Sequence, residues 1–379
     1  MLIAVLRLLS SEGARGEIRH DDIRSLLIVE LSRLGDVISM LPAIGALKVG
    51  FPHATVHLLI DESYGTLIRN LQLDVVVHPI PKSDSANGLV QAILNARRIG
   101  EDLAINLSPS KRNAIPVLAS TSRFKVGYFS HMNSLTPFLL QTKVESFGCT
   151  LKSEEIYGRE NISERGWKVC RSIGINARGT TQSLRLKQGV FETVATELKR
   201  NGVLPEGPYV VIHPFSGWMY RSWDIQRFNL LAERVVQTTS CAVLFVYSRE
   251  EAGKIEELRK RHEANRTVSF FSSDNLLESA VAIQGGSLFV GNDSGPLHLA
   301  SMLGVRVVGL YGPAEPALTA PRNGRNSFLY KRVECSPCDQ RKCIRPDDSC
   351  MKMISVDDVY SVVVASLAAV DSAPTAAHV

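Results

Sequence analysis

Short apolar runs alternate with helical segments along most of this chain, and the alternation occurs twice. In the first half the apolar runs extend from residues 25–31 to 103–107, and in the second half from 209–213 to 305–311. Strands that are apolar throughout need cover on both faces, and helices between consecutive strands supply it in parallel sheets. One core rarely serves 379 residues, so we predict two α/β domains, each with a doubly wound parallel sheet.

The alternation lapses at Asn176–Thr181, where apolar periodicity is lost. We therefore place the domain boundary there. The predicted organisation is an N-terminal extension over residues 1–24, a first domain over 25–180, a second over 181–355, and a C-terminal helix and tail over 356–379. Ligands of such sheets bind beyond the carboxyl ends of the strands, which predicts a site in a cleft between two facing domains.

Composition narrows the class of protein. The formal net charge of +5 is mild and like charges form no block, so we expect no nucleic-acid partner. No apolar run approaches the roughly 18 residues of a membrane span. The cysteines number seven, an odd count that suits a reducing cytoplasm better than a disulfide scaffold. We predict a cytoplasmic protein, and a peripheral contact at the cytoplasmic face of the inner membrane stays open.

The strongest local motif runs from Leu288 to Ala300. An apolar strand ends at a Gly-Asn-Asp-Ser-Gly break, and a helix begins near Pro296. The N–H groups and the dipole of a helix start make it a natural seat for phosphate. An ordinary strand–helix junction would explain the Gly and Pro, but not Asn-Asp-Ser followed by a His on the first turn. The motif supplies four candidate residues for binding a sugar nucleotide: Asp293, Ser294, Gly295 and His298.

Two further strand ends carry candidate residues. After the first apolar strand, Asp36 lies at a helix start, where its carboxylate either favours the helix dipole or takes a proton from a sugar hydroxyl. The strand 209–213 leads into a loop that contains Ser216, Gly217 and Arg221. Their hydroxyl, N–H and guanidinium groups can bind the oxygens of a diphosphate, with an ordinary loop as the alternative.

Together these motifs resemble the heptosyltransferase family, glycosyltransferase family nine, over about residues 25–355. The most specific parts are Ser-x-x-Gly-Asp-x-x-x-x-x-Pro near the start and Asn-Asp-Ser-Gly-Pro-x-His-Leu-Ala near the end. The resemblance implies a GT-B fold, in which two Rossmann-like domains face each other across a cleft. It also implies inverting transfer of a sugar, typically heptose from ADP-heptose, with no metal or other cofactor required for catalysis.

The motif match carries roles over to particular residues. Asp36 stands where the family has its general base, and Arg221 replaces a family Lys that contacts the nucleotide phosphates. Arginine keeps the charge but forks its donors. Ser216 matches a hydroxyl residue on the phosphates, and the segment Asp293–Gly295 matches the cradle of the nucleotide sugar and diphosphate.

Two further sets of contacts depend on looser matches. Glu250 falls where a family carboxylate holds a ribose hydroxyl, Glu251 is an equal candidate, and a surface helix is the alternative for both. The acceptor that the resemblance implies is a lipopolysaccharide core or another glycolipid or glycan. Because such cores carry phosphate and acidic sugars, we predict that Lys111 and Arg112 bind the acceptor, with a solvated surface charge as the alternative for each.

Four cysteines cluster near the end of the predicted second domain: Cys335, Cys338, Cys343 and Cys350. Four thiolates suffice for one tetrahedral zinc or iron site, and the first pair has the C-x-x-C spacing of a metal knuckle. Such a metal would hold the loop before the last helix in place and take no part in catalysis. Reduced buried thiols or a redox pair are the alternatives.

Two other functions fit the same architecture. A sugar-nucleotide epimerase would need only the nucleotide sugar and no acceptor. A non-catalytic sugar-nucleotide-binding protein would have no need of a base, so the presence of Asp36 argues against it. We therefore favour a glycosyltransferase.

Overall fold

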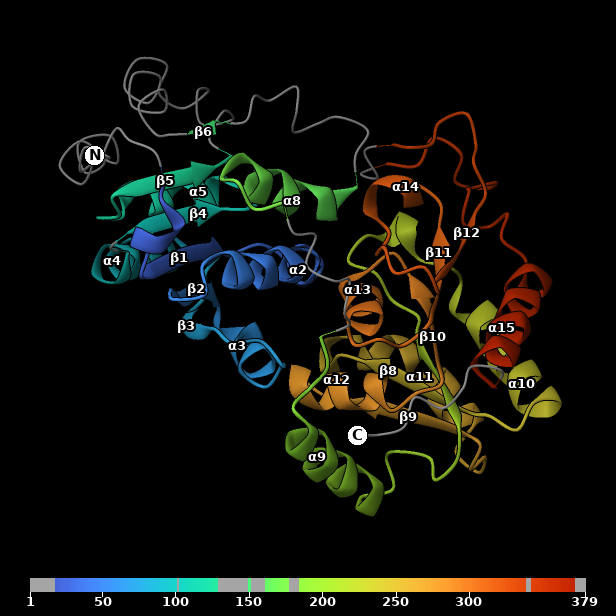
Figure 1. The fold of residues 1–379 in the computed structure, drawn as a ribbon. Coiled ribbons are helices and arrows are strands. Elements are labelled where there is room, and N and C mark those ends of the chain that lie inside the picture. Colours follow the sequence, from blue (N-terminus) through green and yellow to red (C-terminus); the bar gives the residue numbers. More distant parts are fainter. Residues whose placement is uncertain are drawn as a thin grey trace. The chain divides into compact units, whose positions relative to one another are not determined.

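The computed structural model describes residues 18–100, 102–128, 149–150, 161–176, 184–338 and 342–371. The chain divides into two compact units, Met1–Gln182 and Ser183–Val379. Each unit is built around one parallel sheet with helices packed on it (Figure 1). The predicted α/β class with two Rossmann-like units is therefore confirmed.

The sheet of the first unit has the strand order β3-β2-β1-β4-β5-β6, and all its paired strands are parallel. Its strands are β1 (Ser25–Glu30), β2 (Thr55–Asp61), β3 (Val76–Ile80), β4 (Leu103–Asn106), β5 (Phe124–Gly127) and β6 (Cys149–Thr150). Every residue of β1 is buried, as expected for a strand covered on both faces. The chain winds outward from β1 to β3 and then returns to β4 on the other side of β1. The carboxyl ends of β1 and β4 therefore flank the switch point of the sheet, where α/β proteins bind ligands.

Helices cover this sheet. They are the 3-10 helix η1 (His20–Asp22), α2 (Leu34–Gly50), α3 (Glu62–Arg69), α4 (Ala86–Ile99), α5 (Lys111–Ala119) and α8 (Ile162–Ser172). Residues of α4 and α5 pack with Leu27 and Val29 of β1 in one apolar core. Helix α2 packs against α8. Helices α2 and α5 follow β1 and β4, the two strands at the switch point. Both helices therefore begin at the carboxyl edge of the sheet.

The predicted extension over residues 1–24 lies partly in the folded unit. The ring Nε2 of His20 lies 2.7 Å from the carbonyl oxygen of Ile173. Residues 1–17 lie outside the described residues, as do residues 372–379 of the predicted tail. No helix in the part of the chain that the structure describes has the length and apolar character to cross a membrane.

The sheet of the second unit has the strand order β12-β11-β10-β7-β8-β9 and is again parallel. Its strands are β7 (Tyr209–His213), β8 (Ala242–Tyr247), β9 (Val268–Ser272), β10 (Leu288–Asn292), β11 (Val307–Tyr311) and β12 (Ser327–Tyr330). The chain runs outward from β7 to β9 and returns to β10 on the other side of β7. The switch point of this sheet therefore lies at the carboxyl ends of β7 and β10.

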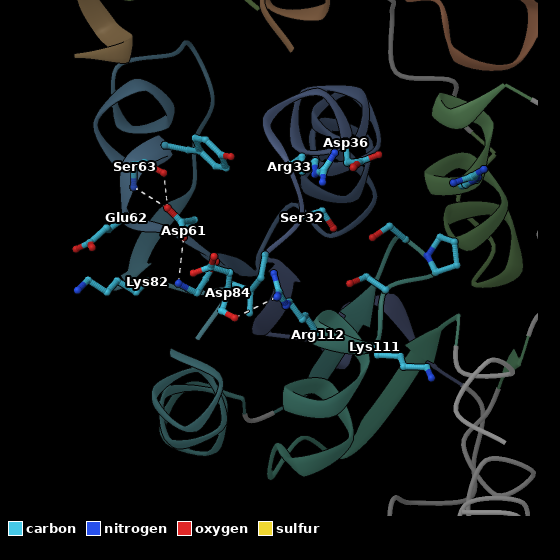
Figure 2. A pocket seen from close by; sticks show the side chains of 17 residues that line it. Ser32, Arg33, Asp36, Asp61, Glu62, Ser63, Lys82, Asp84, Lys111 and Arg112 are labelled. Carbon is cyan, nitrogen blue, oxygen red and sulfur yellow. Dashed lines mark hydrogen bonds between the residues drawn. The ribbon is translucent and has the colours of Figure 1, made fainter. Parts of the chain in front are cut away.

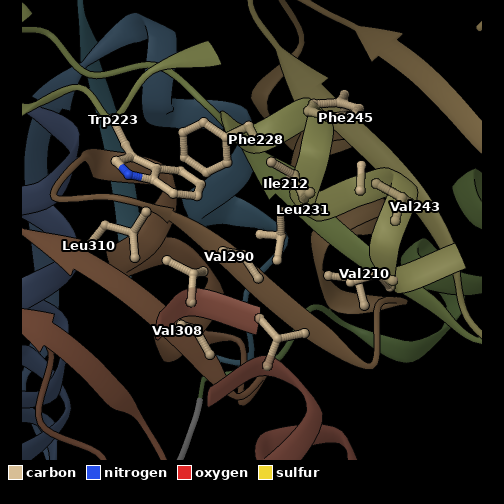
Figure 3. Packing of buried hydrophobic residues seen from close by; sticks show 14 of the residues in the cluster. Val210, Ile212, Trp223, Phe228, Leu231, Val243, Phe245, Val290, Val308 and Leu310 are labelled. Atoms are coloured by element: carbon tan, nitrogen blue, oxygen red, sulfur yellow. The ribbon is translucent and has the colours of Figure 1, made fainter. Parts of the chain in front are cut away.

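The second unit also contains helices. They are α9 (Gln188–Arg200), η3 (Met219–Arg221), α10 (Ile225–Thr238), η4 (Arg249–Glu251), α11 (Ala252–Arg261), α12 (Leu276–Gln284), α13 (Gly295–Met302), α14 (Pro316–Thr319) and α15 (Val356–Asp371). Trp223 and Phe228 pack edge to face with ring centroids 4.8 Å apart. They join Ile212 of β7 and Val290 of β10 in one buried cluster (Figure 3). The Trp223 Nε1–H also donates to the Ile354 carbonyl at 2.8 Å, so the end of the loop that carries Arg221 is held in the core.

Candidate functional site

The first unit has a pocket of about 950 Å³ at the carboxyl edge of its sheet. The segments that follow β1, β2, β3 and β4 form it, together with one residue of α8 (Figure 2). Its lining includes four carboxylates and five cationic side chains. A pocket with this many charges suits a polar ligand that carries anionic groups and hydroxyls.

Asp36, the predicted general base, is one of the four carboxylates that line this pocket. It lies half-buried in the first turn of α2 and lines the pocket. Asp61 is instead the N-cap of α3, and its carboxylate accepts the N–H groups of Ser63 at 3.0 Å and Ser83 at 3.1 Å. Although burial acts to raise the pKa of Asp61, these hydrogen bonds outweigh it and hold the pKa below its usual range. Asp61 is thus a structural cap and a weak base, whereas Glu62 is exposed.

The predicted acceptor residues Lys111 and Arg112 both line this pocket from the first turn of α5. Arg112 also donates from Nη2 to the backbone carbonyl of Asp84 at 3.1 Å (Figure 2). The sequence analysis missed Arg165 of α8, which lines the same pocket. Its Nε is buried and has no hydrogen-bond partner within the described residues. Such a donor is well suited to an anionic ligand group.

In the second unit, Asn292 fixes the loop that was predicted to bind phosphate. Asn292 is the last residue of β10 and is fully buried. Its Nδ2 donates to the Pro214 carbonyl at 2.7 Å, and its Oδ1 accepts the Trp223 N–H at 2.9 Å. Both ends of the loop 214–223 are therefore tied to the end of β10. No separate role could be predicted for Asn292 from the sequence, because only the folded loop brings its partners together.

This loop brings Ser216 and Arg221 into contact with Asp293, just before the start of α13. The Ser216 hydroxyl donates to the backbone carbonyl of Asp293 at 3.3 Å. Gly217 is exposed on the same loop. Arg221 Nη1 lies 3.0 Å from Asp293 Oδ2, with side-chain exposures of 24% and 5% respectively. The predicted diphosphate site therefore contains a largely buried ion pair with its cation on the more exposed side.

Burial sets the protonation of the side chains around this ion pair. It raises the pKa of Asp293, while the Arg221 guanidinium acts to lower it. Burial also lowers the pKa of His298 to about 4, and Arg221 acts in the same sense. His298 is therefore neutral at pH 7, with its Nε2 4.0 Å from Asp293 Oδ1. Arg221 supplies the positive side-chain charge of this cluster.

Three buried polar atoms at this site have no hydrogen-bond partner among the residues that the structure describes: Asp293 Oδ2, Ser294 Oγ and Tyr311 Oη. Asp293 Oδ2 meets Arg221 only as an ion pair. Ser294 is the N-cap of α13, and its side chain does not cap the helix. Native proteins leave few such atoms unpaired, so their concentration here is typical of a ligand site. Tyr311 could not be predicted as a site residue, because it ends an ordinary apolar strand.

The two glutamates considered for ribose binding differ in the structure. The Glu251 carboxylate accepts the N–H and the hydroxyl of Ser248, each at 2.9 Å, and forms a capping box. Glu250 is exposed. Because Glu251 is engaged as a cap, Glu250 is the better candidate for a ribose hydroxyl and stays a prediction.

The four clustered cysteines line one pocket of about 240 Å³. Burial raises the pKa of Cys350, and the other three thiols add to this effect. The Cys338 N–H donates to the Pro313 carbonyl at 3.1 Å, which ties this segment to the loop after β11. Thiols suit zinc or iron, but no three His, Cys, Asp or Glu side chains within the described ranges are placed to hold one metal ion. The structure thus shows proximity of the four thiols and no assembled metal site.

Known proteins resemble this chain over most of its length. The model of glycosyltransferase family 9 (heptosyltransferase) matches residues 97–347. Lipopolysaccharide heptosyltransferase 3 of Escherichia coli K12 is 23% identical over 298 residues, which cover 76% of this chain and 82% of the relative. The solved structure of a family 9 glycosyl transferase from Veillonella parvula aligns with a TM-score of 0.78 at 18% identity, over 93% of this chain and 100% of that one. The ADP-heptose lipopolysaccharide heptosyltransferase II of E. coli aligns with a TM-score of 0.70 at 16% identity, over 92% of this chain and 100% of that one.

Proposed function

This chain belongs to glycosyltransferase family 9, and from this premise we propose that it transfers heptose from ADP-heptose to a lipopolysaccharide-core acceptor. Its relatives include lipopolysaccharide heptosyltransferases, one of them named for ADP-heptose. The observation that carries the proposal is that the chain has two charged sites of different character, one in each unit. The pocket with Asp36 suits a hydroxylated, anionic acceptor, and the Arg221–Asp293 pair at the start of α13 suits a diphosphate.

In the proposed reaction, a carboxylate oxygen of Asp36 takes the proton of the acceptor hydroxyl. The hydroxyl oxygen forms a bond to the anomeric carbon of the sugar. The bond from that carbon to the diphosphate oxygen breaks with inversion, and its electron pair leaves with ADP. Arg221, Ser216 and the N–H groups at the start of α13 stabilise the departing charge, so we propose that transfer needs no metal.

Calorimetric titration with ADP, GDP and UDP tests the donor. We expect ADP to bind with a Kd at least about tenfold lower than the other two. Preference for GDP or UDP would keep a transferase and discard ADP-heptose, whereas binding of none would contradict the roles of Ser216, Arg221 and Asp293. Incubation with ADP-heptose and no acceptor should return the sugar unchanged, since an epimer would favour the rival epimerase.

We propose that Lys111 and Arg112 bind anionic groups of the acceptor. Replacing both with alanine should raise the KM for the acceptor by about tenfold and flatten its salt dependence, because two charge contacts are lost. Arg98→Ala is the matched control, since Arg98 is an exposed cation of the same unit that does not line the pocket. An acceptor KM that is unchanged in the double variant would mean that neither residue binds the acceptor.

We also propose that Cys335, Cys338, Cys343 and Cys350 bind a structural zinc or iron ion, which would draw together the four thiols that line one pocket. Anaerobically purified protein should then contain about one ion per chain, and less in Cys338→Ser. Finding neither metal would end this proposal. The peripheral contact with the inner membrane stays a prediction.

A further inference from the structure

Glu30, the last residue of β1, has a fully buried carboxyl group that the proposed chemistry does not use. Burial raises the pKa of Glu30, and the nearby charge of Asp36 acts in the same sense. Within the described ranges, no Lys, Arg or His forms an ion pair with it. A buried acid without a cation is costly unless hydrogen bonds compensate for it. Glu30 stands beside Leu31 and Ser32, which line the pocket of the first unit.

The Glu30 carboxyl belongs to a closed set of hydrogen bonds. Its Oε1 accepts the Nδ2–H of Asn113 at 2.9 Å and the Ser32 N–H at 3.3 Å, and its Oε2 accepts the Ser108 hydroxyl at 3.1 Å. Asn113 Nδ2 also donates to Ser108 Oγ at 2.8 Å, and Asn113 Oδ1 accepts the Leu31 N–H at 2.8 Å. Each member is thus bonded to at least one other, which makes the network rigid.

This network joins the two segments that form the centre of the pocket. Ser32 lies in the segment between β1 and α2, which leads to Asp36, and it lines the pocket. Ser108 lies in the segment between β4 and α5 and also lines the pocket. Asn113 is in the first turn of α5, beside Lys111. The two segments leave neighbouring strands at the switch point of the sheet, where the chain turns away in opposite directions.

We propose that Glu30 is a positioning residue that fixes the segment leading to the base Asp36 against the segment carrying the acceptor cations Lys111 and Arg112. This inference rests on the proposed function. As a consequence, the acceptor hydroxyl reaches the base only while the two segments keep their positions relative to each other. Misplacement by about 1 Å can cost a hundredfold in rate.

The test compares Glu30→Ala with Glu30→Gln. Glutamine keeps the shape, can accept from Asn113 and Ser32 through its oxygen, and can donate to Ser108 through its amide nitrogen. Alanine leaves those groups buried without Glu30. Lys125→Met is the matched control, because it removes another fully buried polar contact of this unit, to the Leu118 carbonyl, away from the pocket lining.

Two readouts are measured on the full chain. For Glu30→Ala we expect kcat/KM for the acceptor to fall about 100-fold, with ADP affinity unchanged, and for Glu30→Gln a loss of at most about threefold. Without any substrate, hydrogen exchange at the Leu31 amide should quicken at least about tenfold in Glu30→Ala and not in Glu30→Gln or Lys125→Met. The hydrogen-exchange measurement tests the role of Glu30 even if the wild type transfers no sugar. Absence of transfer in the wild type would count against the proposed function alone. Glutamine as damaging as alanine, or exchange that quickens equally in Lys125→Met, would overturn the proposal.

Discussion

Replacing Asp36 with asparagine should reduce sugar transfer by about a thousandfold while nucleotide binding persists. The amide has the size and shape of the carboxylate but cannot take the proton of the acceptor hydroxyl. The loss corresponds to about 4 kcal/mol of transition-state stabilisation. Steady-state kinetics with ADP-heptose and a lipopolysaccharide-core acceptor measures kcat. Calorimetry measures the Kd for ADP, which should stay within about twofold of the wild type because the change lies in the other unit.

Glu62→Gln is the matched control for this substitution. Glu62 lines the same pocket and is exposed, and the change from carboxylate to amide is the same. We expect kcat to stay within about twofold of the wild type. If Asp36→Asn kept most of its turnover, another group would remove the proton. Asp61 would be a poor replacement, because hydrogen bonds from Ser63 and Ser83 stabilise its ionised form.

The central strands of both sheets could be predicted from the sequence because they are buried throughout and read as continuous apolar runs. The strands β5, β6 and β12 lie outside the predicted apolar runs. Helices α8 and α9 were not predicted. Gly166 interrupts α8 in sequence, yet a Cβ there would lie 2.7 Å from the Cβ of Ala43, so the glycine allows α8 to approach α2 closely. The sequence of α9 does carry apolar residues at helical spacing, at Val190, Phe191, Val194, Ala195 and Leu198, so this helix could have been predicted and the sequence analysis missed it.

The candidate sites could likewise be predicted only in part from the sequence. Asp293 directly follows β10, Asp36 lies in the first turn of the helix after β1, and Arg221 lies in the loop after β7, so their place at the carboxyl edges of the sheets could be read from the chain. Asn292 and Arg165 could not be assigned in this way, because their roles depend on contacts that exist only after folding. The network around Glu30 is of the same kind, since its members are up to 83 positions apart.

Replacing Arg221 with methionine should weaken ADP binding by about a hundredfold. Methionine keeps aliphatic bulk but removes the guanidinium that lies 3.0 Å from Asp293 Oδ2. The Asp293 carboxylate, which is 5% exposed, would then share a buried site with a diphosphate of the same charge. Calorimetric titration with ADP measures the loss, and thermal unfolding of the apo variant shows whether the fold survives.

The pH dependence of ADP binding should show whether the ionised Asp293 carboxylate causes this loss of affinity. Burial raises the pKa of Asp293 and Arg221 is the group that lowers it, so the pKa rises further when Arg221 is removed. A neutral Asp293 tolerates the diphosphate better than an ionised one, and lower pH favours the neutral form. The affinity of Arg221→Met for ADP, relative to the wild type, should therefore improve as the pH falls from about 8 to about 6. The wild type corrects for the ionisation of ADP itself.

Three further variants separate the charge of Arg221 from its other contacts. Arg221→Lys keeps a cation and should lose no more than about tenfold in ADP affinity. Arg249→Met removes an exposed cation of the same unit, which lies 3.4 Å from Asp274, and should change nothing measurable. Adding Asp293→Asn to Arg221→Met should restore part of the lost affinity, because the unpaired buried carboxylate is then gone. No recovery in the double variant, together with a flat pH profile, would mean that Arg221 binds the diphosphate without neutralising Asp293. Wild-type affinity in Arg221→Met would instead make the ion pair a purely structural contact and move the diphosphate elsewhere.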